Sequence, residues 1–139
     1  MSTHPNYIHF CLLLTQTQAQ LARKWDQALS AHGISFTEFM ILHSLHQAPN
    51  HQLRRVDLAE QVSLTASGVT RLLAPMEKIG LVQKETNQRD ARVSLVKITP
   101  TGQQILQDAT LSLQDRATGL LSAMNLTPLK NLLNQLQPT

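Results

Sequence analysis

Two short amphipathic segments separated by a tight turn, within residues 53–82, constrain the fold of this chain more than any other feature. The first is predicted to be a helix over 56–61. The second is predicted to begin after Thr65, whose hydroxyl can cap a helix, and to end near Ile79, because Gly80 follows. One face of this second helix is apolar and is expected to be buried: Val69, Leu72, Leu73, Met76 and Ile79.

Residues 81–85 and 94–99 are predicted to form two strands joined by a polar loop. In the second strand Val96 and Ile98 share one face with Ser94, since alternate residues of a strand point to the same side. Helix, turn, helix and hairpin in this order indicate a winged helix-turn-helix. The expected fold class is therefore mainly α, with a small β-hairpin wing.

Apolar periodicity and capping signals predict four more helices. Ser35 and Glu38 form a capping-box pattern for a helix that runs to about His46. Thr99 followed by Pro100 is an N-cap with proline at the first helical position. The helices are expected over 8–29, 36–46, about 100–124, and from 127 onward, where leucines repeat at helical spacing.

The positive charge of the chain is concentrated in its middle segment. Residues 54–97 hold eight basic and five acidic residues, an excess equal to the net charge of +3 of all 139 residues. This segment is therefore the candidate for binding a polyanion, while the flanks need another role. A small excess on a solvated surface is the alternative, and charge alone does not decide between them.

Composition favours one cytoplasmic domain that binds neither a membrane nor a cofactor. The length is typical of a single domain, and 42% hydrophobic residues are enough for a core. No apolar run approaches the roughly 20 residues of a membrane span, and the N-terminus lacks a signal-peptide pattern. The single cysteine, Cys11, excludes an internal disulfide and is typical of a reducing compartment.

The second helix of the helix-turn-helix and the hairpin tip are the predicted DNA-binding parts. The major groove, about 12 Å wide, admits one α-helix, and a guanidinium at the tip can enter the adjacent minor groove, where the negative potential is high. Asp90, two residues before Arg92, can hold that guanidinium in one orientation. For Arg54 and Arg55 two roles are alternatives: contact with phosphates, or keeping the surface solvated. The predicted DNA-binding residues are Thr65, Ser67, Thr70, Arg71, Lys78, Arg89, Asp90 and Arg92.

These motifs together resemble the MarR (multiple antibiotic resistance regulator) family of winged-helix repressors. The hairpin motif of that family is matched by Asp90, Arg92, Val96, Ile98, Thr99 and Gly102. Its recognition-helix motif is matched by Val69, Thr70, Arg71, Leu72, Glu77, Gly80, Leu81 and Val82. The motifs cover about residues 35–102, and the order of elements agrees over nearly the whole chain.

The resemblance implies a single MarR-type domain over residues 1–139, with a DNA-binding lobe at about 35–102. It implies a homodimer whose terminal helices, about 7–31 and 100–137, interleave, and a pseudo-palindromic double-stranded DNA operator with half-sites about one turn apart. It also implies repression that a small-molecule effector relieves. Ligands of many family members bind between the dimerisation helices and the DNA-binding lobe, and the candidate lining residues here are His9, Leu13, Trp25 and His43.

Cys11 and the histidines invite two other interpretations. One branch of the family, the organic-hydroperoxide sensors, has a reactive cysteine in its first helix, and the position of Cys11 is similar. The alternative is a small buried hydrophobic residue in an apolar stripe. His43, His46 and His51 are close in sequence, but a zinc site needs three or four converging ligands, so no metal site is predicted.

Two further classes of protein are alternatives to a DNA-binding regulator. A winged helix can serve as a protein-interaction module that has lost DNA binding, but Arg71, Asp90 and Arg92 argue against that role. The sequence contains no catalytic triad order, carboxylate pair or phosphate loop. The chain is therefore predicted not to be an enzyme.

Overall fold

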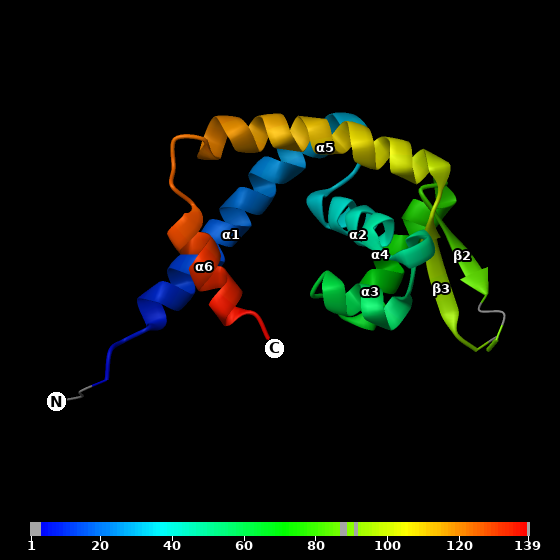
Figure 1. Cartoon of the computed structure of the whole chain (residues 1–139), viewed down its shortest axis with the longest axis horizontal. Helices are drawn as coiled ribbons and strands as arrows, with labels where there is room; N and C mark the ends of the chain where they lie inside the picture. Colours follow the sequence, from blue (N-terminus) through cyan, green and yellow to red (C-terminus); the bar gives the residue numbers. More distant parts are fainter. Residues whose placement is uncertain (1–3, 87–88, 91, 139) are drawn as a thin grey trace.

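The computed structural model describes residues 4–86, 89–90 and 92–138. Two long helices, α1 (Ile8–Leu29) and α5 (Pro100–Leu121), meet above a lobe of shorter elements, and α1 and the last helix, α6 (Thr127–Leu136), extend away from that lobe (Figure 1). The lobe and its connections contain η1 (Ser30–His32), α2 (Phe36–Gln47), η2 (Pro49–His51), β1 (Gln52–Arg54), α3 (Arg55–Gln61), α4 (Ala66–Lys78), β2 (Val82–Thr86) and β3 (Ser94–Ile98). The predicted mainly helical, winged helix-turn-helix fold is confirmed.

Hydroxyl caps start three of the helices, as the sequence predicts. Ser35 Oγ accepts a hydrogen bond from the Glu38 N–H at 3.1 Å, and Glu38 Oε1 accepts one from the Ser35 N–H at 2.9 Å. Thr65 Oγ1 accepts from the Gly68 N–H at 3.0 Å. Thr99 Oγ1 accepts from the Gly102 N–H at 2.9 Å, with proline following at the first helical position. Each cap satisfies a backbone donor that the helix itself leaves unpaired.

The hydrophobic core lies inside the lobe, where the helices cover the sheet and the start of α5. Burying an aliphatic side chain of this size stabilises a fold by about 1.5–3 kcal/mol, so this cluster is the main source of stability. Its largest fully buried side chains come from α1, α2, α3, α4 and β3: Leu29, Ile41, Leu42, Leu45, Leu58, Val69, Leu73, Met76, Val96 and Ile98.

The sheet has three antiparallel strands in the order β1-β3-β2, whereas the sequence predicted two. β2 pairs with β3 through Lys84 opposite Val96, and β1 pairs on the other edge through Leu53 opposite Val96. The hairpin alone would leave one edge of β3 unpaired. β1 is only three residues long, which is too short to show a period of two, so only the tertiary pairing identifies it.

The burial of one residue and the end of one helix differ from the prediction. Ile79 was expected on the buried face of α4 but is 61% exposed, because the helix ends at Lys78 and Gly80 turns the chain at φ +83°. Leu81, which follows this turn, is buried instead. α5 ends at Leu121 rather than near residue 124.

Gly102 fixes the distance between α5 and the hairpin. A Cβ built on this residue would collide with the carbonyl oxygen of Leu81 and would lie 2.9 Å from Cγ1 of Ile98. The same Leu81 carbonyl accepts hydrogen bonds from the Thr99 N–H and from Thr99 Oγ1, both at 3.1 Å. The glycine therefore permits a close approach that joins the wing to the start of α5.

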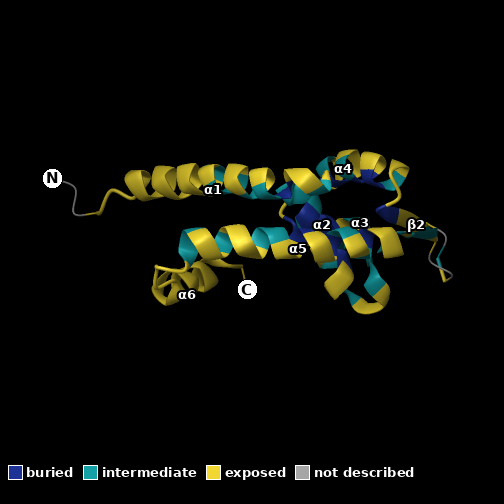
Figure 2. Cartoon of the chain, turned by 90° about the horizontal axis from the view of Figure 1, so that it is seen from above, coloured by how far each residue is buried: buried dark blue, intermediate teal, exposed yellow. Residues whose placement is uncertain are grey.

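The far ends of the chain expose large apolar side chains. Figure 2 shows the N-terminal part of α1 and all of α6 as exposed. None of the described helices combines the length and apolar character that crossing a bilayer requires. The exposed side chains include Ile8, Phe10, Leu12, Leu13 and Leu14 of α1, and Leu129, Leu132, Leu133 and Leu136 of α6.

Candidate nucleic-acid interface

α4 has one face in the core and the opposite face in solvent. Val69, Leu73 and Met76 are buried, and the sequence-predicted contacts lie on the other side. Thr65 Oγ1 is 3.2 Å from Ser67 Oγ, so the small polar side chains gather at the N-terminal end of the helix. The predicted residues of α4 and its cap are all exposed: Thr65, Ser67, Thr70, Arg71 and Lys78. Lys78 lies on the same face but about 16 Å beyond Ser67 along the axis, at a rise of about 1.5 Å per residue.

The wing carries the predicted Asp90–Arg92 pair. Arg92 Nε donates to Asp90 Oδ1 at 3.1 Å and Nη2 donates to Oδ2 at 3.4 Å, while the Arg92 backbone N–H donates to Oδ1 at 3.0 Å. The hydrogen bonds from the Arg92 side chain, and then from its backbone, lower the pKa of the Asp90 carboxyl. The Arg92 side chain remains 91% exposed. It is thus oriented by one carboxylate and accessible to another anion, and Arg89 nearby is also exposed.

Arg55 links α4 to the wing, a contact that the sequence did not predict. It is the first residue of α3, and its Nη1 donates to Thr70 Oγ1 at 3.0 Å. Its Nε donates to Ser94 Oγ, at the start of β3, at 3.3 Å. The partners are 15 and 39 residues away in the chain. A short sequence pattern cannot predict contacts between residues that are this far apart in the chain.

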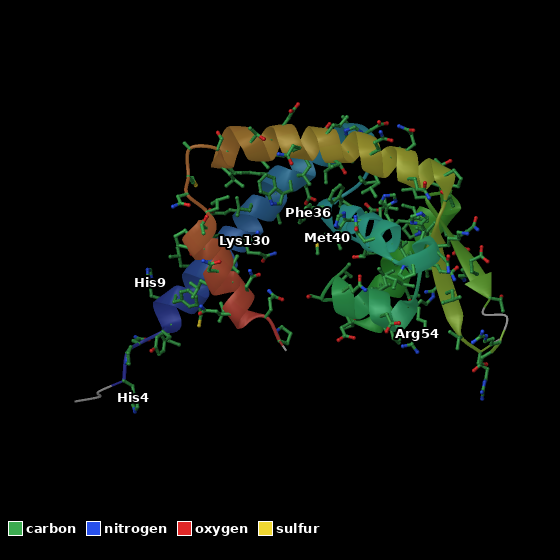
Figure 3. All side chains as sticks on the ribbon, in the orientation of Figure 1. His4, His9, Phe36, Met40, Arg54 and Lys130 are labelled. Atoms are coloured by element: carbon green, nitrogen blue, oxygen red, sulfur yellow. The ribbon has the colours of Figure 1, made fainter. Side chains whose placement is uncertain are left out.

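A hollow of about 230 Å³ lies between the start of α3 and the base of the wing. Arg54 forms an ion pair with Asp57 at 2.8 Å, and this hydrogen bond lowers the pKa of the Asp57 carboxyl. Figure 3 shows Arg54 at the edge of the lobe, beside the wing. Three guanidinium groups therefore border one surface depression. Its lining residues are Arg54, Arg55, Val56, Arg92, Val93 and Ser94.

Two cavities between α2 and α5, of about 530 and 290 Å³, contain one of the four predicted pocket residues. His43 lines both cavities, and its ring is stacked on Phe39 at a centroid distance of 6.2 Å. His9, Leu13 and Trp25 line neither. Figure 3 shows His9 on the part of α1 that is remote from the lobe. Residues of α5 that the sequence did not single out, such as Thr110, line both cavities instead.

The remaining candidates stay apart in the single chain. The rings of His46 and His51 stack at 5.0 Å, and His51 Nδ1 lies 2.8 Å from the His46 carbonyl oxygen. Among the described residues, no three histidine, cysteine or acidic side chains are grouped as metal ligands would be. Cys11 is exposed in this chain rather than buried in an apolar stripe, because the N-terminal part of α1 has no core beside it.

Comparisons with known proteins agree with this architecture. The model of the MarR family matches residues 34–94. The transcriptional regulator PrsX of Escherichia coli is 29% identical over 87 residues, which are 63% of this chain and 52% of PrsX. The chain thus spans about half the length of that relative. The transcriptional repressor MprA of Escherichia coli K12 is 26% identical over 130 residues, 91% of this chain and 74% of MprA.

The fold is also shared with solved structures. A mutant MarR from Escherichia coli, complexed with operator DNA, superposes with a TM-score of 0.86 at 24% identity, covering 97% of this chain and all of that one. The helix-turn-helix, its wing and the paired long helices define a winged helix-turn-helix protein. The chain thus shares its fold with a solved MarR regulator, and over residues 34–94 it is similar to the MarR family.

Proposed function

We propose that this chain is a sequence-specific DNA-binding transcriptional regulator that acts as a homodimeric repressor. The observation that carries the proposal is α4, whose exposed N-terminal face is small and polar while its opposite face is held in the core. A rigidly packed helix with this surface can approach base edges closely. The proposal includes no catalytic activity and no cofactor.

In this proposal α4 enters the major groove and the wing reaches the next minor groove. Thr65, Ser67 and Thr70 donate to phosphates or base edges, and Arg71 binds a guanine or a phosphate with its forked N–H groups. Arg92, oriented by Asp90, enters the minor groove. Lys78 and Arg89 add contacts to the sugar-phosphate backbone.

The exposed ends of the chain support a homodimer. The apolar side chains of α1 and α6 lie outside the core of the single chain, as in Leu14, 39% exposed, and Leu133, 37% exposed. A second copy would cover both sets, since apolar patches of this extent mark protein interfaces. A two-fold dimer presents two α4 helices and so selects a pseudo-palindromic operator, with half-sites about 34 Å apart.

We further propose that a small molecule relieves repression by binding between α2 and α5. His43 lines both of these cavities and lies on α2, a helix of the DNA-binding lobe. α5 connects the wing to the end of the chain that would form the dimer. A ligand that binds better when these helices are displaced would change the spacing of the two α4 helices and release the DNA.

A second mechanism of release is oxidation of Cys11, whose thiol is exposed in the single chain. Oxidants react with accessible cysteines, and a change on α1 would act where the dimer is expected to form. Peroxide treatment of the wild type and of Cys11→Ser separates the two mechanisms. Release of the wild type alone supports the thiol, and equal release of both proteins excludes it.

DNA binding is tested with the purified protein and labelled genomic fragments from its source, followed by fluorescence anisotropy. We expect a preferred fragment with a pseudo-palindromic site, bound by two copies of the chain. Affinity should fall steeply with salt, because each phosphate contact releases counterions. A protein that ignores every double-stranded fragment at low ionic strength would be a protein-interaction module instead.

A further inference from the structure

The hollow between α3 and the wing is a basic concave surface of the lobe, and the proposed groove contacts leave its Arg55 unused. It lies between the two parts that would enter neighbouring grooves, since it touches β3 at Ser94 and is linked to α4 through Thr70. A duplex spanning both grooves has a sugar-phosphate strand running between them. The hollow therefore lies where a sugar-phosphate strand of the DNA would cross the lobe.

The charges around the hollow are not balanced. Arg54 is paired with Asp57, and Arg92 is paired with Asp90. Arg55, in contrast, hydrogen-bonds two hydroxyl groups, those of Thr70 and Ser94. Three guanidinium groups and two carboxylates leave one positive charge, and that charge is on Arg55.

The Arg55 guanidinium also keeps unused donors. A guanidinium has five N–H groups, and the bonds to Thr70 and Ser94 use two of them. The other three make no hydrogen bond to the described residues. Its orientation is already fixed at two points, so little conformational entropy remains to be lost when an anion binds.

We propose that this hollow binds one backbone phosphate of the DNA, with Arg55 as its principal ligand. The inference rests on the proposed DNA binding and extends it to a contact between the two grooves. A phosphodiester oxygen accepts from the free N–H groups of Arg55, and Arg54 and Arg92 add positive potential at the rim. Because Arg55 also holds Thr70 and Ser94, the contact ties one phosphate to both α4 and the wing.

The test uses DNA in which single phosphates are replaced by uncharged methylphosphonates. In the wild type, replacement at the phosphate in the hollow should weaken binding. In Arg55→Gln, overall affinity should fall about tenfold, the salt slope should drop by about one, and replacement at that phosphate should have no further effect. Sensitivity at all other phosphates should be retained. If no position loses its effect in Arg55→Gln, the proposal is overturned.

Two controls distinguish phosphate binding by Arg55 from two other effects, the positioning of its neighbours and the loss of a positive charge. Ser94→Ala removes one hydrogen-bond partner of Arg55 but keeps the Arg55 charge, so its DNA binding should still be weakened by replacement of the same phosphate. If Ser94→Ala lost as much affinity for DNA as Arg55→Gln, Arg55 would act only by positioning its neighbours. Arg23→Ala makes the same charge change on the exposed surface of α1 and should leave the sensitivity to each phosphate replacement unchanged.

Should Arg55→Gln not fold, Arg55→Lys replaces it. Lysine keeps the charge but lacks the fork, so affinity equal to the wild type would refute the proposal.

Further outcomes distinguish failure of the proposed function from failure of this inference, and a DNA phosphate from free phosphate. If the wild type binds no DNA at all, the proposed function fails. If it binds and Arg55→Gln binds equally well, only this inference fails. Inorganic phosphate, added at constant ionic strength, should not displace the DNA. Displacement from the wild type but not from Arg55→Gln would assign the hollow to free phosphate and overturn the assignment to DNA.

Discussion

Gly102→Ala should destabilise the protein, because α5 and the hairpin approach each other too closely for a side chain at this position. The added Cβ would collide with the Leu81 carbonyl oxygen and crowd Ile98 Cγ1, 2.9 Å away. The carbonyl cannot move freely, since it accepts two hydrogen bonds from Thr99. α5 must therefore shift away from the wing.

The expected magnitude follows from two unfavourable terms and one favourable term. Overpacking a well-filled site costs about 1–3 kcal/mol. A shift of α5 also weakens the bond from the Thr99 N–H to the Leu81 carbonyl, which contributes about 1 kcal/mol; the single hydrogen of the Thr99 hydroxyl lies closer to the Gly80 carbonyl, at an oxygen–oxygen distance of 2.6 Å. Replacing glycine by alanine in a helix offsets up to about 1 kcal/mol. The net change is a loss of about 1–3 kcal/mol in the free energy of unfolding.

Urea unfolding followed by circular dichroism measures this change, with all proteins at one protomer concentration because a dimer is stabilised by mass action. Gly119→Ala is the matched control, since it lies in the same helix and its Cβ would meet no atom within 4 Å. We expect the control to be up to about 1 kcal/mol more stable than the wild type. A Gly102→Ala protein as stable as the wild type would refute the close approach of α5 to the wing.

Four other outcomes are expected. Arg92→Ala should weaken operator binding by about 10- to 100-fold, measured by anisotropy, and leave the dimer intact; unchanged affinity would contradict the role of the wing. Leu133→Glu should convert the dimer to monomers in analytical ultracentrifugation, because it places a charge on the exposed apolar face of α6; a persistent dimer would contradict the role of that face. The folded pKa of Asp90 is lowered, so the contribution of its pair with Arg92 is present above about pH 3.9 and is lost as the pH falls through the lower, folded value. NMR titration should find the Asp90 midpoint below about 3.9, and higher in Arg92→Ala than in the wild type. Cys11→Ser should resist release from DNA by peroxide if the thiol is the sensor, and should respond like the wild type if it is not.

The candidate site was predicted where its residues are neighbours in sequence or on one helix face. The Asp90–Arg92 pair and the exposed polar face of α4 follow from spacings of two and of three or four residues. The cavities form between α2 and α5, more than 50 residues apart, so no short window of sequence contains their lining. Only His43 of the four predicted pocket residues lines a cavity there.

The sequence by itself determined the local structures. These are the hydroxyl caps at Ser35, Thr65 and Thr99, the helices that they start, and the order of helix, turn, helix and hairpin that defines the winged helix-turn-helix. These depend on interactions within a few residues, so their signals lie in short windows of sequence. The tertiary structure alone decided that a three-residue segment becomes β1, that Ile79 is exposed and that Arg55 joins α4 to the wing. Each of these depends on which residue, distant in the sequence, lies beside it in the fold. Such contacts have no fixed spacing in the sequence, so a single sequence does not predict them.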